Sequence, residues 1–101
     1  MITADFTIIP IGTQDTGCKE YIKTAVEVIK DSGLNFQLTA MGTQIEADNL
    51  QELYDVISKA QEAVFEAGTG RLYSVIKIDD RRDMKKRSLN DKIESVEKIL
   101  K

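Results

Sequence analysis

The 101-residue sequence predicts an α+β fold of the ferredoxin-like βαββαβ type with an additional C-terminal helix. Segments of two-residue and of helical apolar periodicity follow one another as strand, helix, strand, strand, helix, strand. Because crossovers between parallel strands are right-handed, this order gives the split βαβ sandwich. The length suits one domain. We therefore expect a single domain over residues 1–101, with the core sandwich in 1–79 and a charged link and the last helix in 80–101.

A change in the periodicity of apolar residues separates the first strand from the first helix. Residues 1–9 alternate between apolar and polar side chains, which predicts a half-buried strand that Pro10 and Gly12 end. After Gly17 the apolar residues recur at three- and four-residue steps, as in an amphipathic helix. Gly33 supplies the residue that ends this helix.

A hairpin is expected next, built of a strand, a tight turn at Met41-Gly42 and a short third strand at 43–47. Glu46 lies in this third strand, although glutamate is disfavoured in strands. Because its neighbour Ile45 should point into the core, Glu46 should point to the opposite face of the sheet.

The remaining core elements are a second helix and a fourth strand. Asp48 is expected to cap the helix, with Gln51 in the reciprocal position of a capping box. An apolar stripe continues to Gly68, which ends the helix. Residues 71–79 then alternate as a strand.

Beyond this core, Ser88 is expected to open a C-terminal helix that the minimal sandwich does not need. Its apolar residues are spaced four, three and four apart, a narrow seam suited to another helix or chain: Leu89, Ile93, Val96 and Leu100. The link from Asp79 to Arg87 carries both acidic and basic side chains. We expect inter-subunit salt bridges there, with phosphate binding by Arg81 and Arg82 as the alternative.

Composition excludes several functions. A net charge of -3 does not provide the basic surface that binds nucleic acid. Residues 43–47 also lack the aromatic side chains with which RNA-recognition modules stack bases. The absence of histidine removes the commonest general base and metal ligand. Cys18 is the only cysteine, and we expect it to be buried and inert. We expect no catalysis, no metal, no membrane span and a cytoplasmic location.

In this fold both helices cover one face of the sheet and leave the other face open. The open face would carry mainly polar residues: Thr3, Asp5, Thr7 and Ile9, then Asn35, Gln37 and Thr39, then Gln44 and Glu46, then Arg71, Tyr73, Val75 and Lys77. A solvated face is the usual outcome for an antiparallel sheet. The alternative is contact with another subunit that encloses a small molecule at the seam, and the additional helix favours it.

Four motifs occur in the order and spacing of the thiamine-binding family of small ferredoxin-like proteins: Ile9-Pro10-Ile11-Gly12-Thr13, Ser32-Gly33-Leu34, Met41-Gly42-Thr43-x-Ile45-Glu46 and Ile78-Asp79-Asp80-Arg81. The sequence resembles this family over nearly its whole length, and the third motif is the most specific. The resemblance implies a homotetrameric cytosolic protein that binds thiamine or its hydroxymethylpyrimidine part, without known catalysis. Ala40, Ala47 and the Thr16–Cys18 segment depart from the family's usual Pro, Gly and paired serines, which bears on ligand preference.

The residue types and the resemblance together predict ligand contacts at a subunit seam by Gly12, Thr13, Met41, Gly42, Thr43 and Glu46. Glu46 is expected to hold an aminopyrimidine that Thr43 helps to orient, and Gly42 lets the backbone approach closely. The alternatives are a surface carboxylate near a helix N-terminus for Glu46 and a simple β-branched strand residue for Thr43. The alternative function is an oligomeric regulatory or interaction module that senses another small molecule.

Overall fold

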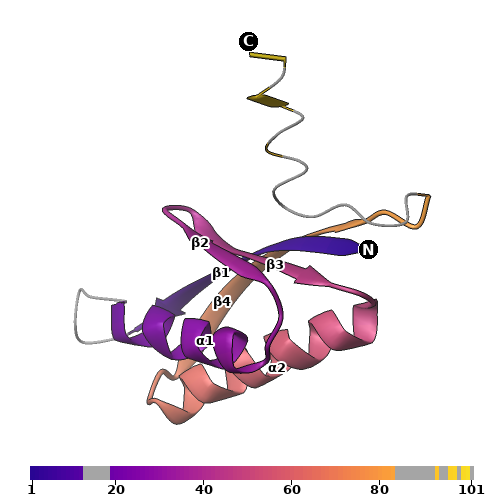
Figure 1. Ribbon diagram of the computed structural model, residues 1–101. Helices are drawn as coiled ribbons and strands as arrows, with labels where there is room; N and C mark the ends of the chain where they lie inside the picture. The colour runs from indigo at the N-terminus through magenta and orange to yellow at the C-terminus, as the bar shows by residue number, and fades with distance from the viewer. Residues whose placement is uncertain (13–18, 84–92, 94–95, 98, 101) are drawn as a thin grey trace.

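A computed structural model of the chain describes residues 1–12, 19–83, 93, 96–97 and 99–100 (Figure 1). Within them the order of elements is βαββαβ with two helices, which confirms the predicted ferredoxin-like core. The elements are β1 (Ile2–Ile11), α1 (Lys19–Asp31), β2 (Phe36–Thr39), β3 (Gly42–Ala47), α2 (Leu50–Glu66) and β4 (Arg71–Asp80).

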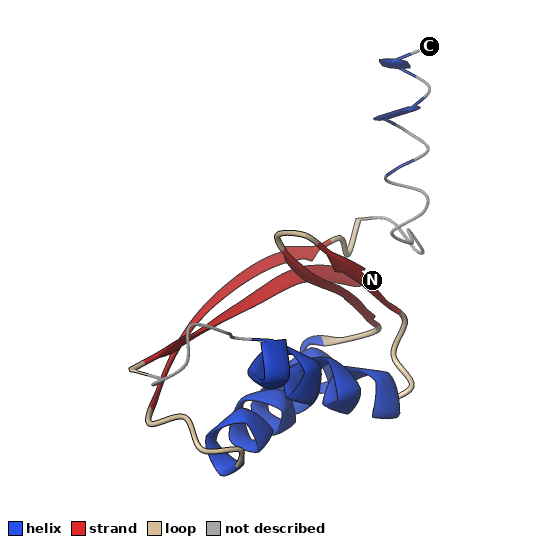
Figure 2. Cartoon of the chain, turned by 90° about the vertical axis from the view of Figure 1, so that its left-hand side faces the viewer, coloured by secondary structure: helices blue, strands red, loops and turns tan. Residues whose placement is uncertain are grey.

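The four strands form one antiparallel sheet in the order β2-β3-β1-β4. Both helices lie on the same side of this sheet, as Figure 2 shows, so its other face is open as predicted. The core lies between the two layers and consists of Ile2, Ala4, Phe6, Ala25, Ile29, Ile45, Ala47, Leu53, Val56, Ile57, Ala60 and Val64. None of the described helices is long and apolar enough to cross a membrane.

The first strand continues beyond its predicted end. Pro10 lies within β1, opposite Leu72 of β4, and the strand ends at Ile11. The pairing of β1 with β3 stops at Phe6, so β1 has only one neighbouring strand beyond that point. A proline is tolerated in such an edge position, because its missing N–H need not serve a second ladder. The prediction that Pro10 ends the strand was therefore wrong.

The cap of α2 lies one residue later than predicted. Asn49 is the N-cap, and its Oδ1 accepts a hydrogen bond of 2.9 Å from the backbone N–H of Glu52. The Glu52 carboxylate in turn accepts from the backbone N–H of Asp48 at 3.2 Å. Gln51 instead donates to Asp55 one turn further along the helix. Asn49 therefore caps the helix in place of Asp48, and the residue that reaches back from the first turn is Glu52, not Gln51.

The predicted C-terminal helix falls mostly outside the described residues, as do Thr13 and Cys18. No third helix is defined among the residues that the structure describes. The described apolar residues of that segment are exposed: Ile93, Val96, Ile99 and Leu100.

Candidate functional site

A hollow of about 140 Å³ lies between α1 and the β2–β3 hairpin, and we call it the interlayer hollow. On the side of β1 and α1, Thr7 is the one polar residue of the wall, and the others are apolar: Phe6, Ile8, Ile22, Ala25, Val26 and Ile29. The hairpin closes the other side with Leu38 and residues 39–43. This hollow therefore collects the Met41-Gly42-Thr43 part of the most specific motif of the sequence.

Thr43 supplies the buried polar group of the interlayer hollow. It pairs with Phe6 across the sheet and shares the helix-facing side of β3 with Ile45. Thr43 is only 6% exposed. In the part of the chain that the structure describes, its hydroxyl makes no hydrogen bond. No fully buried side-chain oxygen or nitrogen of the described residues lacks a partner, so this hydroxyl oxygen keeps some contact with solvent in the hollow. The group is therefore available to a polar atom of a bound molecule.

The tight turn beside Thr43 is held by threonine side chains. The Thr39 hydroxyl donates to the backbone oxygen of Gly42 at 2.9 Å and accepts from the N–H of Met41 at 3.3 Å. The Met41 side chain is 82% exposed and stands with Leu38 at the rim of the hollow. The turn is thus fixed in its backbone while its apolar side chains remain open to a ligand.

Glu46 lies on the other face of the sheet, as predicted, but it is buried there at 8% exposure. It pairs with Thr3, which in turn pairs with Asp79. The Asn35 side-chain amide donates to the Glu46 carboxylate at 2.9 Å, and the backbone N–H of Glu46 donates to the Asn35 oxygen, also at 2.9 Å. Glu46 is therefore not an exposed surface carboxylate. It cannot meet the same ligand as Thr43 within one chain.

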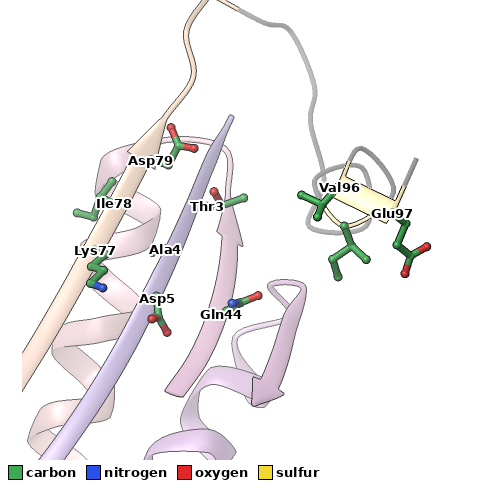
Figure 3. Close-up of a pocket in the computed structure, with 10 residues that line it drawn as sticks. Thr3, Ala4, Asp5, Gln44, Lys77, Ile78, Asp79, Val96 and Glu97 are labelled. Carbon is green, nitrogen blue, oxygen red and sulfur yellow. The ribbon is translucent and has the colours of Figure 1, made fainter. Parts of the chain in front are cut away.

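A second, larger hollow of about 550 Å³ lies on the open face, between the sheet and the C-terminal segment. Figure 3 shows its sheet side chains, with Asp5 and Lys77 among them, and the approach of Val96 and Glu97. Asp79 adds a further carboxylate. We call it the open-face hollow. The described residues contain no group of ligands that could hold a metal ion.

Of the two remaining predicted ligand residues, only Gly12 is among the residues that the structure describes. Gly12 follows β1 with a φ of 78°, a left-handed conformation that favours glycine. It does not line the interlayer hollow among the residues described. Thr13 is outside the described residues. The structure thus brings Met41, Gly42 and Thr43 together and separates Glu46 from them.

The charged link pairs with itself in its described part. Arg81 binds Asp83 and Arg82 binds Asp80, each at 2.9 Å. The hydrogen bond from Arg81 holds the pKa of Asp83 below its usual value, and the same pair raises the pKa of Arg81. The hydrogen bond with Asp80 likewise raises the pKa of Arg82. These exposed arginines already have carboxylate partners, which weakens the alternative of a phosphate site.

Sequence reasoning missed the contribution of α1 to the site. Ile22, Ala25 and Ile29 were recognisable only as an apolar helix stripe, and their place opposite the hairpin depends on the packing of the two layers. One signal was available: Thr43 is two residues from Ile45, and side chains two apart share a face of a strand. Asn35 as the partner of Glu46 had no comparable signal.

The fold and the site define a class: a ferredoxin-like sandwich with a small, mostly apolar hollow between its layers. The profile of the family described as "Thiamine-binding protein" matches residues 4–97, and the chain belongs to this family.

Relatives and solved structures agree with this membership. A UPF0045 protein of Methanothermobacter thermautotrophicus is 48% identical over 100 residues, which is 98% of this chain and 100% of the relative. The UPF0045 protein YqgV of Bacillus subtilis is 42% identical over 104 residues, covering 99% of this chain and 98% of the relative. The crystal structure of the hypothetical protein MJ1052 from Methanocaldococcus jannaschii superposes with a TM-score of 0.84 at 30% identity, covering 95% of each chain. A DUF77 domain of unknown function from Bacillus cereus gives a TM-score of 0.79 at 28% identity, over 91% of this chain and 86% of that one.

Proposed function

We propose that the chain binds thiamine, or the hydroxymethylpyrimidine part of thiamine, without transforming it, and that the interlayer hollow receives the pyrimidine ring. The observation that carries this proposal is Thr43, a residue only 6% exposed that lines the interlayer hollow and whose hydroxyl makes no hydrogen bond with the described residues. Membership of the thiamine-binding family supplies the class of ligand.

The size of the hollow favours one ring. An apolar cavity of about 150 Å³ holds a benzene molecule, and the interlayer hollow measures about 140 Å³. The bare pyrimidine ring has nearly the dimensions of benzene, whereas its amino, methyl and methylene substituents and the thiazolium ring of thiamine need further space. The thiazolium ring would therefore lie at the rim, beside the exposed Leu38 and Met41.

The polar edge of the ring suits the hydroxyl of Thr43, which is the most buried of the three threonines that line the hollow. Threonine offers one donor and two acceptor lone pairs. It can accept from the 4-amino group of the pyrimidine or donate to a ring nitrogen. The apolar walls formed by Phe6 and Ile29 would contact the faces and the methyl group of the ring.

The other predicted site residues take different parts in this proposal. Met41 and Gly42 contact the ligand from the hairpin turn, and Gly12 and Thr13 remain predicted ligand contacts. Glu46 instead acts on the fold: its bonds with Asn35 fasten the beginning of β2 to β3. This division follows from the two faces of β3.

We further propose a cytoplasmic homotetramer in which the open face and the C-terminal segment make the subunit contacts. Exposed apolar side chains favour association, and the chain has them both in the C-terminal segment and at the rim of the interlayer hollow. A neighbouring subunit over Ile22, Leu38 and Met41 would place the thiazolium at a subunit seam.

The absence of turnover is also part of the proposal. General acid–base catalysis needs a titratable group within reach of the reacting atoms. The described residues that line the interlayer hollow are apolar or carry hydroxyls. Thiamine and its phosphates should therefore be recovered unchanged after incubation with the protein.

A second candidate is a regulatory module that senses a different, larger molecule in the open-face hollow. Its volume of about 550 Å³ and its carboxylates from Asp5, Asp79 and Glu97 would suit a cation. This function does not use Thr43, so the two candidates are separable.

A thermal-shift panel of thiamine, its phosphates, hydroxymethylpyrimidine and the isolated thiazole tests the proposal. A ligand present at 100 times its Kd adds about 2.7 kcal/mol of stability. We expect every compound that contains the pyrimidine to raise the melting temperature and the thiazole alone to leave it unchanged. If no compound of the panel changes the melting temperature, the second candidate function is favoured.

A further inference from the structure

We propose that Thr7 of β1, which itself lines the interlayer hollow, is a positioning residue for the ligand-binding turn. This inference rests on the proposed function, because it concerns the turn that carries Met41, Gly42 and Thr43. Nothing in the sequence pattern of Thr7 distinguishes it from the other polar residues of the open face.

The first observation is a direct hydrogen bond. The Thr7 hydroxyl donates to the backbone oxygen of Met41 at 3.0 Å, across 34 positions of the chain. The ladder between β1 and β3 ends one residue earlier, at the pair of Phe6 and Thr43. The turn therefore projects past the backbone ladder, and the Thr7 side chain connects it to the central strand.

The second observation explains why position 42 is a glycine. A Cβ atom added to Gly42 would lie 2.6 Å from the Thr7 hydroxyl oxygen and 2.8 Å from a carboxylate oxygen of Asp5. Both distances are shorter than ordinary van der Waals contact. Because glycine has no side chain, the hydroxyl of Thr7 can pass close to position 42 and reach the carbonyl of Met41.

Two threonines fix the turn, each through different hydrogen bonds. Thr39 fixes the turn within the hairpin, through Met41 and Gly42. Thr7 fixes the whole turn relative to β1, and β1 also carries Phe6 and Ile8 of the opposite wall. Thr7 therefore sets the distance between the two walls of the interlayer hollow.

The test compares Thr7→Val with Thr7→Ser by calorimetric titration with hydroxymethylpyrimidine and by amide hydrogen exchange of the ligand-free protein. Valine keeps the shape and removes the hydroxyl, whereas serine keeps the hydroxyl. A neutral hydrogen bond of this kind corresponds to roughly a two- to tenfold change in affinity. We expect Thr7→Val to weaken binding by that factor and to speed exchange at 41–43, and Thr7→Ser to restore both.

Thr24→Val is the matched control, because the Thr24 hydroxyl also donates to a backbone oxygen, that of Glu20, but does not line the hollow. It should leave affinity and exchange at the turn unchanged. Equal affinity of Thr7→Val and the wild type would overturn the inference, even if exchange were faster. If the wild type itself binds neither hydroxymethylpyrimidine nor thiamine, the proposed function fails, and the exchange comparison still decides whether Thr7 fixes the turn.

Discussion

Thr43 and Glu46, three residues apart on β3, project from opposite faces of the sheet. Thr43 pairs with Phe6 on the side of the helices, and Glu46 pairs with Thr3 on the open side. Both side chains are buried, at 6% and 8% exposure. Thr43 makes no hydrogen bond with the described residues, whereas Glu46 has the Asn35 amide. One strand thus separates a group suited to a ligand from a group that holds the hairpin.

The Thr43 hydroxyl should not stabilise the ligand-free protein. Thr43→Val removes a hydroxyl that makes no hydrogen bond with the described residues and adds apolar surface to a residue only 6% exposed, so we expect the free energy of unfolding to stay equal or to rise by up to about 1 kcal/mol. Thr69 is the matched control: it is equally buried, and its hydroxyl donates to the Arg71 backbone oxygen at 3.0 Å. Thr69→Val should lower the free energy of unfolding by about 1 kcal/mol. Denaturant titrations of both variants measure these changes in the free energy of unfolding. If Thr43→Val lowers the free energy of unfolding as much as Thr69→Val does, Thr43 has a structural partner.

Glu46→Gln should affect the fold more than the ligand. The substitution keeps the shape but replaces a charge-assisted hydrogen bond from Asn35 with a neutral one, which costs about 1 kcal/mol. In a domain of this size that corresponds to a decrease of about 4–8 °C in the melting temperature. Differential scanning calorimetry of the ligand-free proteins checks this. An unchanged melting temperature would mean that the Asn35 contact contributes little.

The Arg81–Asp83 pair should produce a small acid-sensitive contribution to stability. The pKa of Asp83 is lowered in the folded protein, chiefly by its hydrogen bond with Arg81. The contribution is therefore present above the unfolded pKa of Asp83 and is lost as the pH falls through the lower, folded pKa. NMR titration of the Asp83 carboxylate should show its pKa rising toward the usual value in Arg81→Gln. The same pKa in both proteins would show that the pair does not persist in solution.

Removal of residues 88–101 should reduce the size of the assembly. The described part of this segment exposes Ile99 and Leu100 almost completely, at 84% and 80%, and such side chains are suited to contacts between subunits. Light scattering should give a smaller particle for a chain that ends at Arg87 than for the full chain. If both chains form particles with the same number of subunits, the segment makes no subunit contact.

The sequence predicts the fold well because periodicity reports burial directly. The alternation in β1 and the helical stripe of α1 each locate a core face, and the structure confirms the order of all six core elements. Ends are less predictable. Pro10 can lie inside β1 because the pairing of β1 with β3 stops before it. Asn49 rather than Asp48 is the N-cap of α2, which depends on where β3 ends.

The site is predictable only in part, for a related reason. The motif at 41–43 lies at a turn that lines the interlayer hollow, but a motif read as a string does not separate the two faces of a strand. Thr43 and Glu46 project from opposite faces because side chains three residues apart on a strand alternate. The wall supplied by Ile22 and the anchoring role of Thr7 depend on tertiary packing and have no local signature.

The most direct test of the central claim is calorimetric titration of hydroxymethylpyrimidine into the wild type, Thr43→Val, Thr43→Ser and Glu46→Gln. We expect Thr43→Val to bind roughly two- to tenfold more weakly, because one hydrogen bond to the ring is lost. Thr43→Ser should retain most of the affinity, and Glu46→Gln should bind within about twofold of the wild type despite its lower stability. The opposite pattern, with unchanged affinity in Thr43→Val and a large loss in Glu46→Gln, would contradict the account and place the ligand on the open face of the sheet.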